Sequence, residues 1–564
     1  MTTTDKKTIK PVIYQLFPRL FTNTCNSCVP YGTIAQNGAG KMNQIDTRVL
    51  NSLRDMGVTH VWYTGIVQHA SKTDYSAYGI HKSNPHVVKG NAGSPYAITD
   101  YYDVDPDIAV DVNQRMKEFE QLVQRTHACG LKVVLDFVPN HVARQYRSLA
   151  KPKGVEDLGQ TDDKGMFFSP NNNFYYITGK PFSPSVDMGE GDDKYVEYPA
   201  KATGNDCFHE CPGVNDWFET VKLNYGVDPW NGSKHFSPIP STWTKMCDIL
   251  LFWAAKGVDA FRCDMAHMVP VEFWHWAIAK VKEQYPDVVF IAELYDVGIY
   301  HSYIHYGGFD YLYDKVNLYD KLCAIVKNEE SAASLTQCWQ TVEGMQAHML
   351  NFLENHDELR LASPQQFGDA ELAFPAVIVS ATMSTSPFML YQGQELGEDG
   401  KGATGYSGDD GRTSIFDYTT MPLVEKWYSH GKCSIHKINN KARRIRAFYT
   451  KILKMCATEQ AISQGAFFDL MYVNYQNLNP QKQYVYLRHF DHETLLIGVN
   501  FHADDAVLEI DIPAHAFQCL GIQSGVCFMK ELLSGKQKTA EFSPTAKFQM
   551  RLPAHGGVVW KIVH

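Results

Sequence analysis

The sequence predicts an α/β fold, namely a (β/α)8 TIM barrel with an irregular domain inserted after the third strand and a C-terminal antiparallel β-sandwich. Three observations lead to this prediction. Apolar strand-like runs alternate with helix-like segments eight times up to about residue 460. A long segment without helical periodicity interrupts the alternation after the third run, and short alternating strands with turn signals end the chain. Eight alternating units are typical of a closed parallel barrel.

The expected barrel strands are mostly continuous apolar runs, which is typical of strands covered on both faces. They lie at residues 11–20, 59–67, 131–141, 257–266, 287–295, 308–314, 348–358 and 386–396. Amphipathic segments such as 46–57 and 112–130 separate the first strands. Each of these two segments ends in glycine, a common residue at the C-terminal cap of a helix, so we expect both to be helices.

The composition of the remaining segments suggests the domain boundaries. Residues 142–240 are rich in Gly, Pro, Asn and Asp and lack helical periodicity. Structureless loops of that length are rare, so we expect a small irregular domain there. Residues 461–564 show the pattern of the antiparallel β-sandwich. The catalytic barrel is therefore expected in two parts, 1–141 and 241–460.

The net charge and the apolar pattern argue against nucleic acid and membranes as partners. The chain has 564 residues and a formal net charge of −10. This balance disfavours nucleic acid and anionic membranes, because phosphate binding requires a basic patch. No stretch is long and apolar enough to span a membrane, and the first residues lack the apolar core and cleavage site of a signal peptide. We therefore expect a cytoplasmic protein, and its oligomeric state stays open.

The thirteen cysteines favour free thiols in a reducing compartment over a disulfide framework, because their number is odd and most lie inside strand- or helix-like runs. Cysteines inside such runs include Cys129, Cys247, Cys263 and Cys323. Two further pairs, Cys25 with Cys28 and Cys207 with Cys211, could supply four zinc ligands. These pairs are far apart and differently spaced, so free thiols or a disulfide are the favoured interpretation.

Three acidic residues each lie at the end of a strand-like run: Asp264, Glu293 and Asp357. In a parallel barrel all strands end at one rim, where barrel enzymes keep their chemistry. Carboxylates that converge there suit sugar chemistry, in which one ionised group attacks and one protonated group donates. The pattern therefore indicates both a fold and a reaction.

Four segments resemble the conserved segments of the α-amylase superfamily, glycoside hydrolase family 13, in order and on the expected strands. They read DFVPNH at 136–141, GVDAFRCD at 257–264, AEL around Glu293, and ENHDE at 354–358. The eighth strand adds YQGQELG, which is also similar to that family. The resemblance covers the barrel, the insertion and the C-terminal sandwich, and so essentially the whole chain.

This resemblance implies a role for each acidic residue. Asp264 would be the nucleophile of a retaining reaction, and Glu293 the general acid/base, which must be protonated before it donates. Asp357 would bind ring hydroxyls through charge-assisted hydrogen bonds. Arg262 precedes Asp264 by two residues, so both side chains point to the same face of the strand. Its fixed charge is expected to keep Asp264 ionised and oriented.

Other family segments supply candidates for sugar binding. His141 and His356 would hydrogen-bond hydroxyls of the same sugar unit, and Tyr96 would stack on the sugar at the cleavage point. Many amylases place a histidine two residues before this tyrosine, whereas this chain has Ser94. Core packing therefore stays an alternative for Tyr96.

A second departure lies after the nucleophile. Many amylases have Lys-His three and four residues later, whereas this chain has His267 and Met268. The subsite on the leaving side is therefore expected to differ, which leaves hydrolysis and glycosyl transfer open. Residues 271–287 are also similar to a stretch of maltosyl-transferring relatives, although an amphipathic helix explains their pattern equally.

Calcium is the one metal that the resemblance implies, at the junction of barrel and inserted domain. Asn140 matches a ligand of the family, and the Met268 carbonyl is a further candidate. A hard cation needs six to eight oxygens, so most of the ligand set is missing from the prediction, and Asn140 could instead brace the loop. No organic cofactor is expected, because glycosyl transfer needs only acids, bases and binding groups.

The sequence thus indicates a retaining enzyme that cleaves α-1,4 bonds of maltooligosaccharides derived from starch or glycogen. One alternative is a transglycosylase that moves maltosyl or glucosyl units to another sugar. A non-catalytic glycan-binding barrel is less favoured, because the three carboxylates, Arg262 and both histidines are all present.

Overall fold

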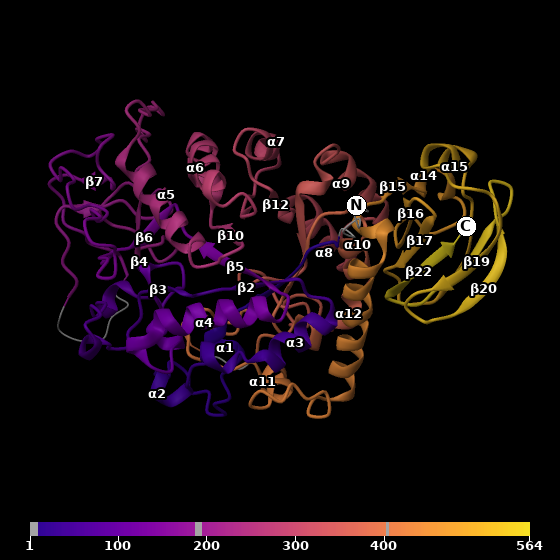
Figure 1. Cartoon of the computed structure of the whole chain (residues 1–564), viewed down its shortest axis with the longest axis horizontal. Coiled ribbons are helices and arrows are strands. Elements are labelled where there is room, and N and C mark those ends of the chain that lie inside the picture. Colours follow the sequence, from indigo (N-terminus) through magenta and orange to yellow (C-terminus); the bar gives the residue numbers. More distant parts are fainter. Residues whose placement is uncertain (1–8, 187–193, 402–404, 564) are drawn as a thin grey trace, which may run out of the picture.

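The computed structural model describes residues 9–186, 194–401 and 405–563. At its centre, eight parallel strands close into a barrel, with the last strand, β14, paired to the first (Figure 1). In order around the barrel, the strands are β1 Val12–Leu16, β2 His60–Tyr63, β5 Lys132–Phe137, β10 Ala260–Cys263, β11 Val289–Ala292, β12 Tyr311–Tyr313, β13 Met349–Phe352 and β14 Phe388–Tyr391. Each lies within one of the eight expected runs, so the predicted barrel is confirmed.

The register of the barrel brings three strand ends to one level. Cys263 of β10 lies opposite Phe137 of β5 and Ala292 of β11. The N–H group of Asp264 then donates to the Phe137 carbonyl at 2.9 Å. The N–H group of Glu293 donates to the Cys263 carbonyl at 3.0 Å. Both acidic residues therefore leave the barrel side by side at its C-terminal rim.

Helices follow the strands and surround the barrel (Figure 1). They are α3 Thr47–Met56, α4 Arg115–Ala128, α5 Ser241–Ala254, α6 Val271–Gln284, α7 Tyr300–His305, α8 Asp320–Val326, α9 Leu335–Thr341, α10 Phe374–Thr382 and α12 Asn440–Thr458. Three further helices are α1 Pro18–Phe21, α2 Ile34–Asn37 and α11 Pro422–Tyr428.

Local signals explain where these helices begin and end. At the start of α3 the Asp46 carboxylate accepts hydrogen bonds from the N–H groups of Arg48 and Val49, which would otherwise lack partners. Gly57 ends the helix with a φ of 115°, in the left-handed region that favours glycine. α4 is likewise followed by Gly130, with a φ of 76°. Both expected helices are confirmed.

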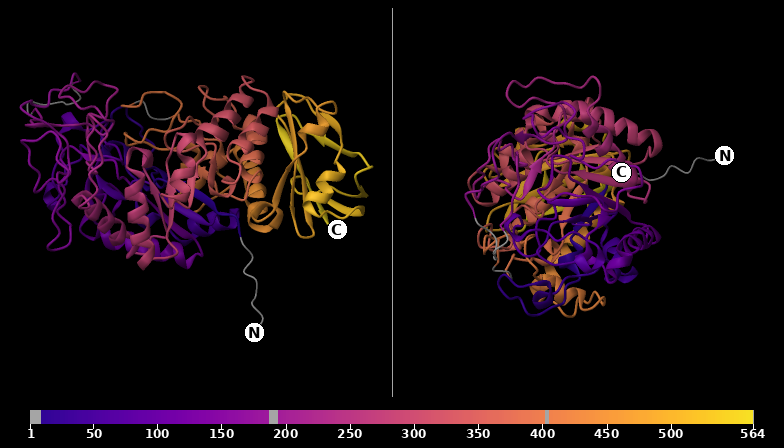
Figure 2. Two further views of the ribbon diagram at one scale, coloured as in Figure 1. Left: turned by 90° about the horizontal axis from the view of Figure 1, so that it is seen from above. Right: turned by 90° about the vertical axis from the view of Figure 1, so that its left-hand side faces the viewer.

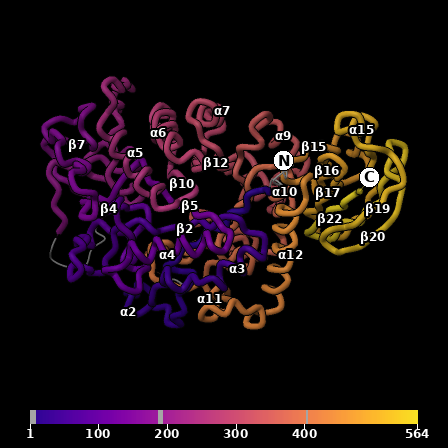
Figure 3. Tube along the Cα trace, viewed as in Figure 1, coloured from indigo at the N-terminus to yellow at the C-terminus, as the bar shows by residue number. Residues whose placement is uncertain are grey.

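The segment between β5 and α5 folds outside the barrel (Figure 3). It contains two antiparallel pairs of short strands, and its described residues form no helix. The pairs are β6 His141–Ala143 with β9 Thr220–Lys222, and β7 Tyr176–Ile177 with β8 Ala200–Lys201. A second excursion, which the sequence did not predict, is the hairpin of β3 Val67–His69 and β4 Ile98–Val104 between β2 and α4.

The C-terminal part is an antiparallel β-sandwich, as predicted. A six-stranded sheet has the order β15, β16, β17, β22, β19, β20, and β18 pairs with β21. The elements are β15 Ala466–Asp469, β16 Gln483–Phe490, β17 Glu493–Asn500, β18 Ala506–Ile510, β19 Gly525–Glu531, β20 Gln537–Phe542, β21 Phe548–Leu552, β22 Gly556–Val563, α13 Gln460–Ser463, α14 Met471–Asn474 and α15 Ala514–Leu520. This sandwich and the inserted segment lie at opposite ends of the molecule (Figure 2).

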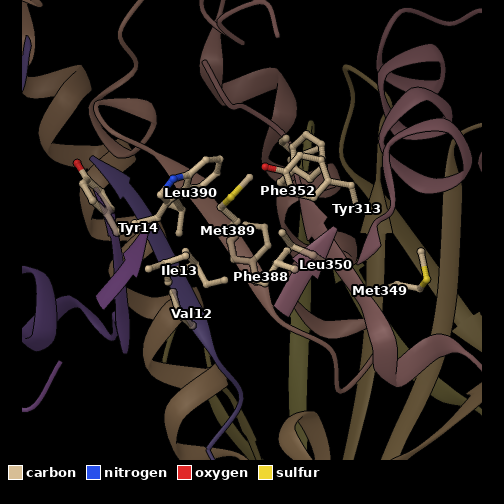
Figure 4. Packing of buried hydrophobic residues seen from close by; sticks show 14 of the residues in the cluster. Val12, Ile13, Tyr14, Tyr313, Met349, Leu350, Phe352, Phe388, Met389 and Leu390 are labelled. Atoms are coloured by element: carbon tan, nitrogen blue, oxygen red, sulfur yellow. The ribbon is translucent and has the colours of Figure 1, made fainter. Parts of the chain in front are cut away.

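Apolar side chains fill the space within and around the barrel. Figure 4 shows such residues from β1, β12, β13 and β14, among them Ile13, Leu350 and Phe388, which are all buried. Burial of this kind is the main favourable contribution to folding and fixes the strand ends that carry the polar site. None of the described helices combines the length and the apolar character needed to cross a membrane.

Candidate active site

A cavity of about 360 Å³ opens at the C-terminal rim of the barrel. Five of the residues predicted to bind or transform substrate line it: Tyr96, His141, Asp264, Glu293 and Asp357. A cavity of similar volume, about 380 Å³, lies beside Trp339 and Phe467 and contains none of these five residues. The carboxylates therefore mark the first cavity as the candidate site.

Arg262 is the centre of the site and is almost completely buried. Its Nη1 lies 2.7 Å from Asp264 Oδ1 and 3.3 Å from Asp136 Oδ1. Its Nη2 lies 2.8 Å from Glu293 Oε1. One guanidinium thus contacts three carboxylates, and the predicted pairing of Arg262 with Asp264 is present in the structure.

The charges of this cluster are not balanced. Burial, followed by the charge of Glu293, raises the pKa of Asp264 well above its usual range, and Arg262 offsets only part of this effect. Burial also raises the pKa of Asp136 to about 6. Arg262 therefore lowers the pKa of Asp264, as expected. Burial and Glu293 raise this pKa by more, so the net shift is upward. The cluster retains a proton at higher pH than isolated carboxyl groups do, and that proton belongs to the coupled groups together.

Glu293 accepts two hydrogen bonds from its surroundings. The Tyr295 hydroxyl donates to Oε1 at 2.5 Å, and the Met265 N–H group donates to Oε2 at 2.7 Å. Met265 adopts a φ of 43°, a conformation that is sparsely populated outside glycine and that is frequent at functional sites. The loop after Asp264 is therefore shaped to hold the Glu293 carboxyl group beside the nucleophile candidate.

Asp357 also lines the cavity, and 43 % of its side chain is exposed, whereas the side chains of Asp264 and Glu293 are buried. His356 Nε2 lies 3.0 Å from its Oδ2. The enclosing walls favour the neutral form, but the His356 ring and the Arg262 charge outweigh this and hold the pKa of Asp357 below its usual range. An ionised acceptor therefore faces the cavity.

His356 is held by neighbours that fix its ring. Its Nδ1 lies 2.8 Å from Gln15 Nε2 of β1, which also donates to Thr64 at 2.9 Å. The Tyr96 ring stacks on the His356 ring at a centroid distance of 5.0 Å. Tyr96 therefore packs against a predicted sugar-binding residue and also lines the cavity, so its stacking on sugar stays a prediction.

His141 lies at the start of β6 and is buried, and burial lowers its pKa to about 3. The ring is therefore neutral at physiological pH and can donate and accept hydrogen bonds without charge. The Trp217 ring, which also lines the cavity, lies next to it at a centroid distance of 5.2 Å. An aromatic face and a neutral imidazole are suited to a sugar ring and its hydroxyl groups.

Ser94 and His267, the two departures from the family pattern, both contact residues that line the cavity. Ser94 Oγ accepts a hydrogen bond from the Tyr96 N–H group at 3.2 Å, so it supports the local turn. The His267 ring lies edge-on to the Tyr295 ring at a centroid distance of 6.0 Å. Tyr295 in turn donates to Glu293, so His267 lies beside a residue that contacts the Glu293 carboxyl group.

Sequence reasoning missed several residues of the site. Asp136 contacts Arg262, and Trp62 Nε1 donates to Asp136 Oδ2 at 2.8 Å. Tyr295 follows Glu293 by two residues, a spacing that could have identified it as sharing the same face. Trp217 comes from the inserted segment, which carries no periodic signal that could have pointed to it.

The residues predicted to hold calcium do not fit a calcium ion. Asn140 and the Met268 carbonyl do lie together, but the Lys222 ammonium group lies between them. Its Nζ donates to Asn140 Oδ1 at 2.5 Å and to the Met268 carbonyl at 3.3 Å. Burial lowers the pKa of Lys222, and the charge of Asp206 opposes this shift. A cation position that a lysine fills cannot offer six to eight oxygens to a metal.

The cysteine pairs show no zinc site. All thirteen cysteines lie in the part of the chain that the structure describes, and none of them, including Cys25 and Cys28 of the first pair, forms a disulfide. In the second pair, Cys207 Sγ lies 3.2 Å from His209 Nε2. Within residues 9–186, 194–401 and 405–563, no group of three or more His, Cys, Asp or Glu side chains is arranged to hold a metal ion. The described cysteines are thus thiols and not disulfides, which agrees with one of the two favoured interpretations.

Curated relatives include α-amylases and a transferase. An α-amylase of Streptomyces lividans is 25% identical over 425 residues, which cover 67% of this chain and 42% of that protein. Alpha-amylase 3 of Dictyoglomus thermophilum is 24% identical over 66% of this chain and 68% of its own length. An α-1,4-glucan:maltose-1-phosphate maltosyltransferase of Cereibacter sphaeroides is 36% identical over 93 residues, 15% of this chain and 16% of that protein. The chain thus spans less than half the length of the first and third of these relatives.

Solved structures and a family model complete the comparison. A maltogenic α-amylase from Thermotoga neapolitana has a TM-score of 0.62 and 19% identity, covering 98% of this chain and 99% of that one, which shows a shared fold. The model of the α-amylase catalytic domain matches residues 15–185 and 239–444, more than half of the chain. These ranges contain Asp264, Glu293 and Asp357 of the cavity. With this match over a barrel of the expected architecture, the chain belongs to the α-amylase family.

Proposed function

We propose that the chain cleaves α-1,4-glucosidic bonds of maltooligosaccharides from starch or glycogen by a retaining double displacement. The observation that carries the proposal is the joint contact of Asp264 and Glu293 with Arg262. Retaining enzymes hold their two carboxyl groups about 5–5.5 Å apart, whereas inverting enzymes leave about 6.5–9.5 Å for a water molecule. Two carboxylates on the terminal nitrogens of one guanidinium support the shorter spacing. The α-amylase names of relatives support the substrate class.

In the first step, ionised Asp264 attacks the anomeric carbon while Glu293 protonates the glycosidic oxygen, so that the leaving sugar departs and a glycosyl ester forms. The retained proton of the cluster must then be on Glu293. One Glu293 oxygen must also turn from its present donor to the substrate. Binding of sugar hydroxyls by Asp357 and neutral His141 would hold the ring in place as positive charge develops.

In the second step, Glu293 accepts a proton from water, and the resulting oxygen nucleophile breaks the glycosyl ester with release of Asp264. Two inversions at the anomeric carbon restore its configuration. The free thiols, many of them buried, further support work in a reducing compartment such as the cytoplasm.

The test is the configuration of the first product. Maltoheptaose is incubated with the enzyme, and the anomeric signals are followed by proton NMR before mutarotation. Initial release of the α-anomer supports the proposal, and initial release of the β-anomer contradicts it. Asp264→Asn, handled identically, gives the background rate.

A second candidate is a transglycosylase on the same site. It is favoured by His267 beside Tyr295, which changes the leaving side, and by the segment similar to the maltosyltransferase. Both candidates share the glycosyl ester and differ in whether water or sugar attacks it. Maltoheptaose with excess maltose as acceptor distinguishes them, because chains longer than the substrate form only by transfer.

A further inference from the structure

Lys222 holds an internal position that links the inserted segment to the barrel rim. It ends β9, directly opposite His141 in the antiparallel pair with β6. Only 9 % of its side chain is exposed. A buried lysine is uncommon unless oxygens surround its ammonium group, so its partners indicate its role.

Three oxygens surround the ammonium group. They are Asn140 Oδ1 at 2.5 Å, Asp206 Oδ1 at 2.8 Å and the Met268 carbonyl at 3.3 Å. A lysine ammonium has three N–H donors, so each donor can have one acceptor. One full charge, from Asp206, balances the cation, and the other two acceptors are neutral dipoles.

The three oxygens come from three separate parts of the chain. Asn140 lies between β5 and β6, and its amide also donates to the Gly204 carbonyl at 2.8 Å. Met268 ends the loop after Asp264. Asp206 belongs to the inserted segment and adopts a φ of 62°, which is uncommon for a residue other than glycine. The ammonium group therefore joins the inserted segment to both sides of the catalytic rim.

We infer that the Lys222 ammonium group acts as a built-in cation in place of the calcium ion that the family resemblance implies, and that it positions His141 and the loop after Asp264. It is a positioning residue, because it reaches the cavity only through its neighbours. A metal ion would need the same Asn140 and Met268 oxygens, and the lysine already uses both. The protein therefore keeps its rim ordered without free calcium.

The first experiment uses the unaltered enzyme. The melting temperature and kcat/KM on maltoheptaose are measured after dialysis against EDTA and again after calcium is added. We expect both quantities to stay unchanged within error. A fall of several degrees on chelation that calcium reverses would overturn the inference. The melting temperature does not depend on the reaction, so failure here is distinct from failure of the proposed function.

The second experiment removes the cation. Lys222→Met keeps the length of the side chain but leaves the three oxygens without their donor, and we expect the melting temperature to fall by about 5 °C or more. Lys180→Met is the matched control, since it removes one positive charge from an exposed ion pair of the same segment and should change little. Equal melting temperatures for the two variants would contradict the anchoring role.

The third experiment tests whether the site that the Lys222 ammonium group fills can bind a metal cation. Lys222→Ala empties the space between Asn140, Asp206 and Met268, so calcium chloride should now raise the melting temperature and recover part of kcat/KM. The double variant Lys222→Ala/Asn140→Ala should lose this response. A purely structural lysine would give no metal response, and its absence in a folded Lys222→Ala protein would overturn the assignment of a cation position.

Discussion

Two buried cations organise neighbouring regions of this molecule, and the oxygens around them differ. Arg262 contacts three carboxylates, those of Asp136, Asp264 and Glu293. Lys222 contacts one carboxylate, one amide oxygen and one backbone carbonyl. The first region has more negative than positive charge, and the second is balanced. The excess of carboxylates around Arg262 retains a proton that can be transferred. The charge-balanced oxygens around Lys222 only hold neighbouring segments in place.

The largest effect on activity should follow from replacement of Asp264, the proposed nucleophile among the carboxylates around Arg262. Asp264→Asn is nearly isosteric but cannot form the glycosyl ester, so turnover of maltoheptaose should fall below about 1 % of the unaltered rate. Asp287→Asn, an exposed residue before β11, is the control and should keep full activity. A variant at position 264 with several per cent activity would remove Asp264 from this role.

Glu293→Gln should cause the next largest loss, and its size should depend on the leaving group. An activated aryl α-glycoside departs without protonation, so the variant should retain far more activity on that substrate than on maltoheptaose. Steady-state kcat/KM on both substrates measures the difference. Equal losses would show that Glu293 does not act as the acid.

Arg262→Ala should move the acidic limb of the pH profile of kcat/KM to higher pH. Arg262 lowers the pKa of Asp264, so without it Asp264 requires a higher pH to ionise. The profile is expected to be bell-shaped, with limbs that belong to the coupled cluster. Lys222→Met provides the comparison for the second region. It should lower kcat/KM at every pH and leave the acidic limb at the same pH. A limb that moves equally in both variants would erase the distinction between the two regions.

The smallest effect concerns stability. The folded-state pKa of Asp264 is raised, so the stabilisation linked to its protonation is complete below the unfolded pKa of about 3.9 and is lost as the pH rises through the folded pKa. Asp264→Asn avoids this loss. We expect its melting temperature to exceed that of the unaltered protein by a few degrees at pH 7 and to approach it at pH 4. If the difference in melting temperature between the two proteins did not depend on pH, the carboxylates around Arg262 would not be raising the pKa of Asp264.

The barrel and its acidic residues could be predicted because their signals are local and repeated. Apolar runs marked all eight strands, and the register of parallel strands placed Asp264 and Glu293 together. Tyr295 was within reach of the same reasoning through its spacing from Glu293. Asp136 lay inside a recognised segment, but its place beside Arg262 depends on the pairing of β5 with β10.

The remaining part of the site depends on contacts between distant segments. Trp217 and Lys222 come from an inserted segment whose described residues form only short strands, so no periodicity marked them. The calcium expectation rested on the match of Asn140, with the Met268 carbonyl as a further candidate. It could not account for a lysine 82 residues later in the chain that takes the same oxygen. Matching single ligands identifies a possible site but not the group that competes for it.

The direct pairing of His141 with Lys222 also limits how the inserted segment can change during evolution. Side chains alternate along a strand, so a shift of β9 by one residue would turn Lys222 away and present Val221 or Leu223 instead. Insertions and deletions should therefore accumulate in the loops between β6 and β9 and stay out of Thr220–Lys222. Length variation in homologues of this chain should stop at that short strand, even where the rest of the segment cannot be aligned.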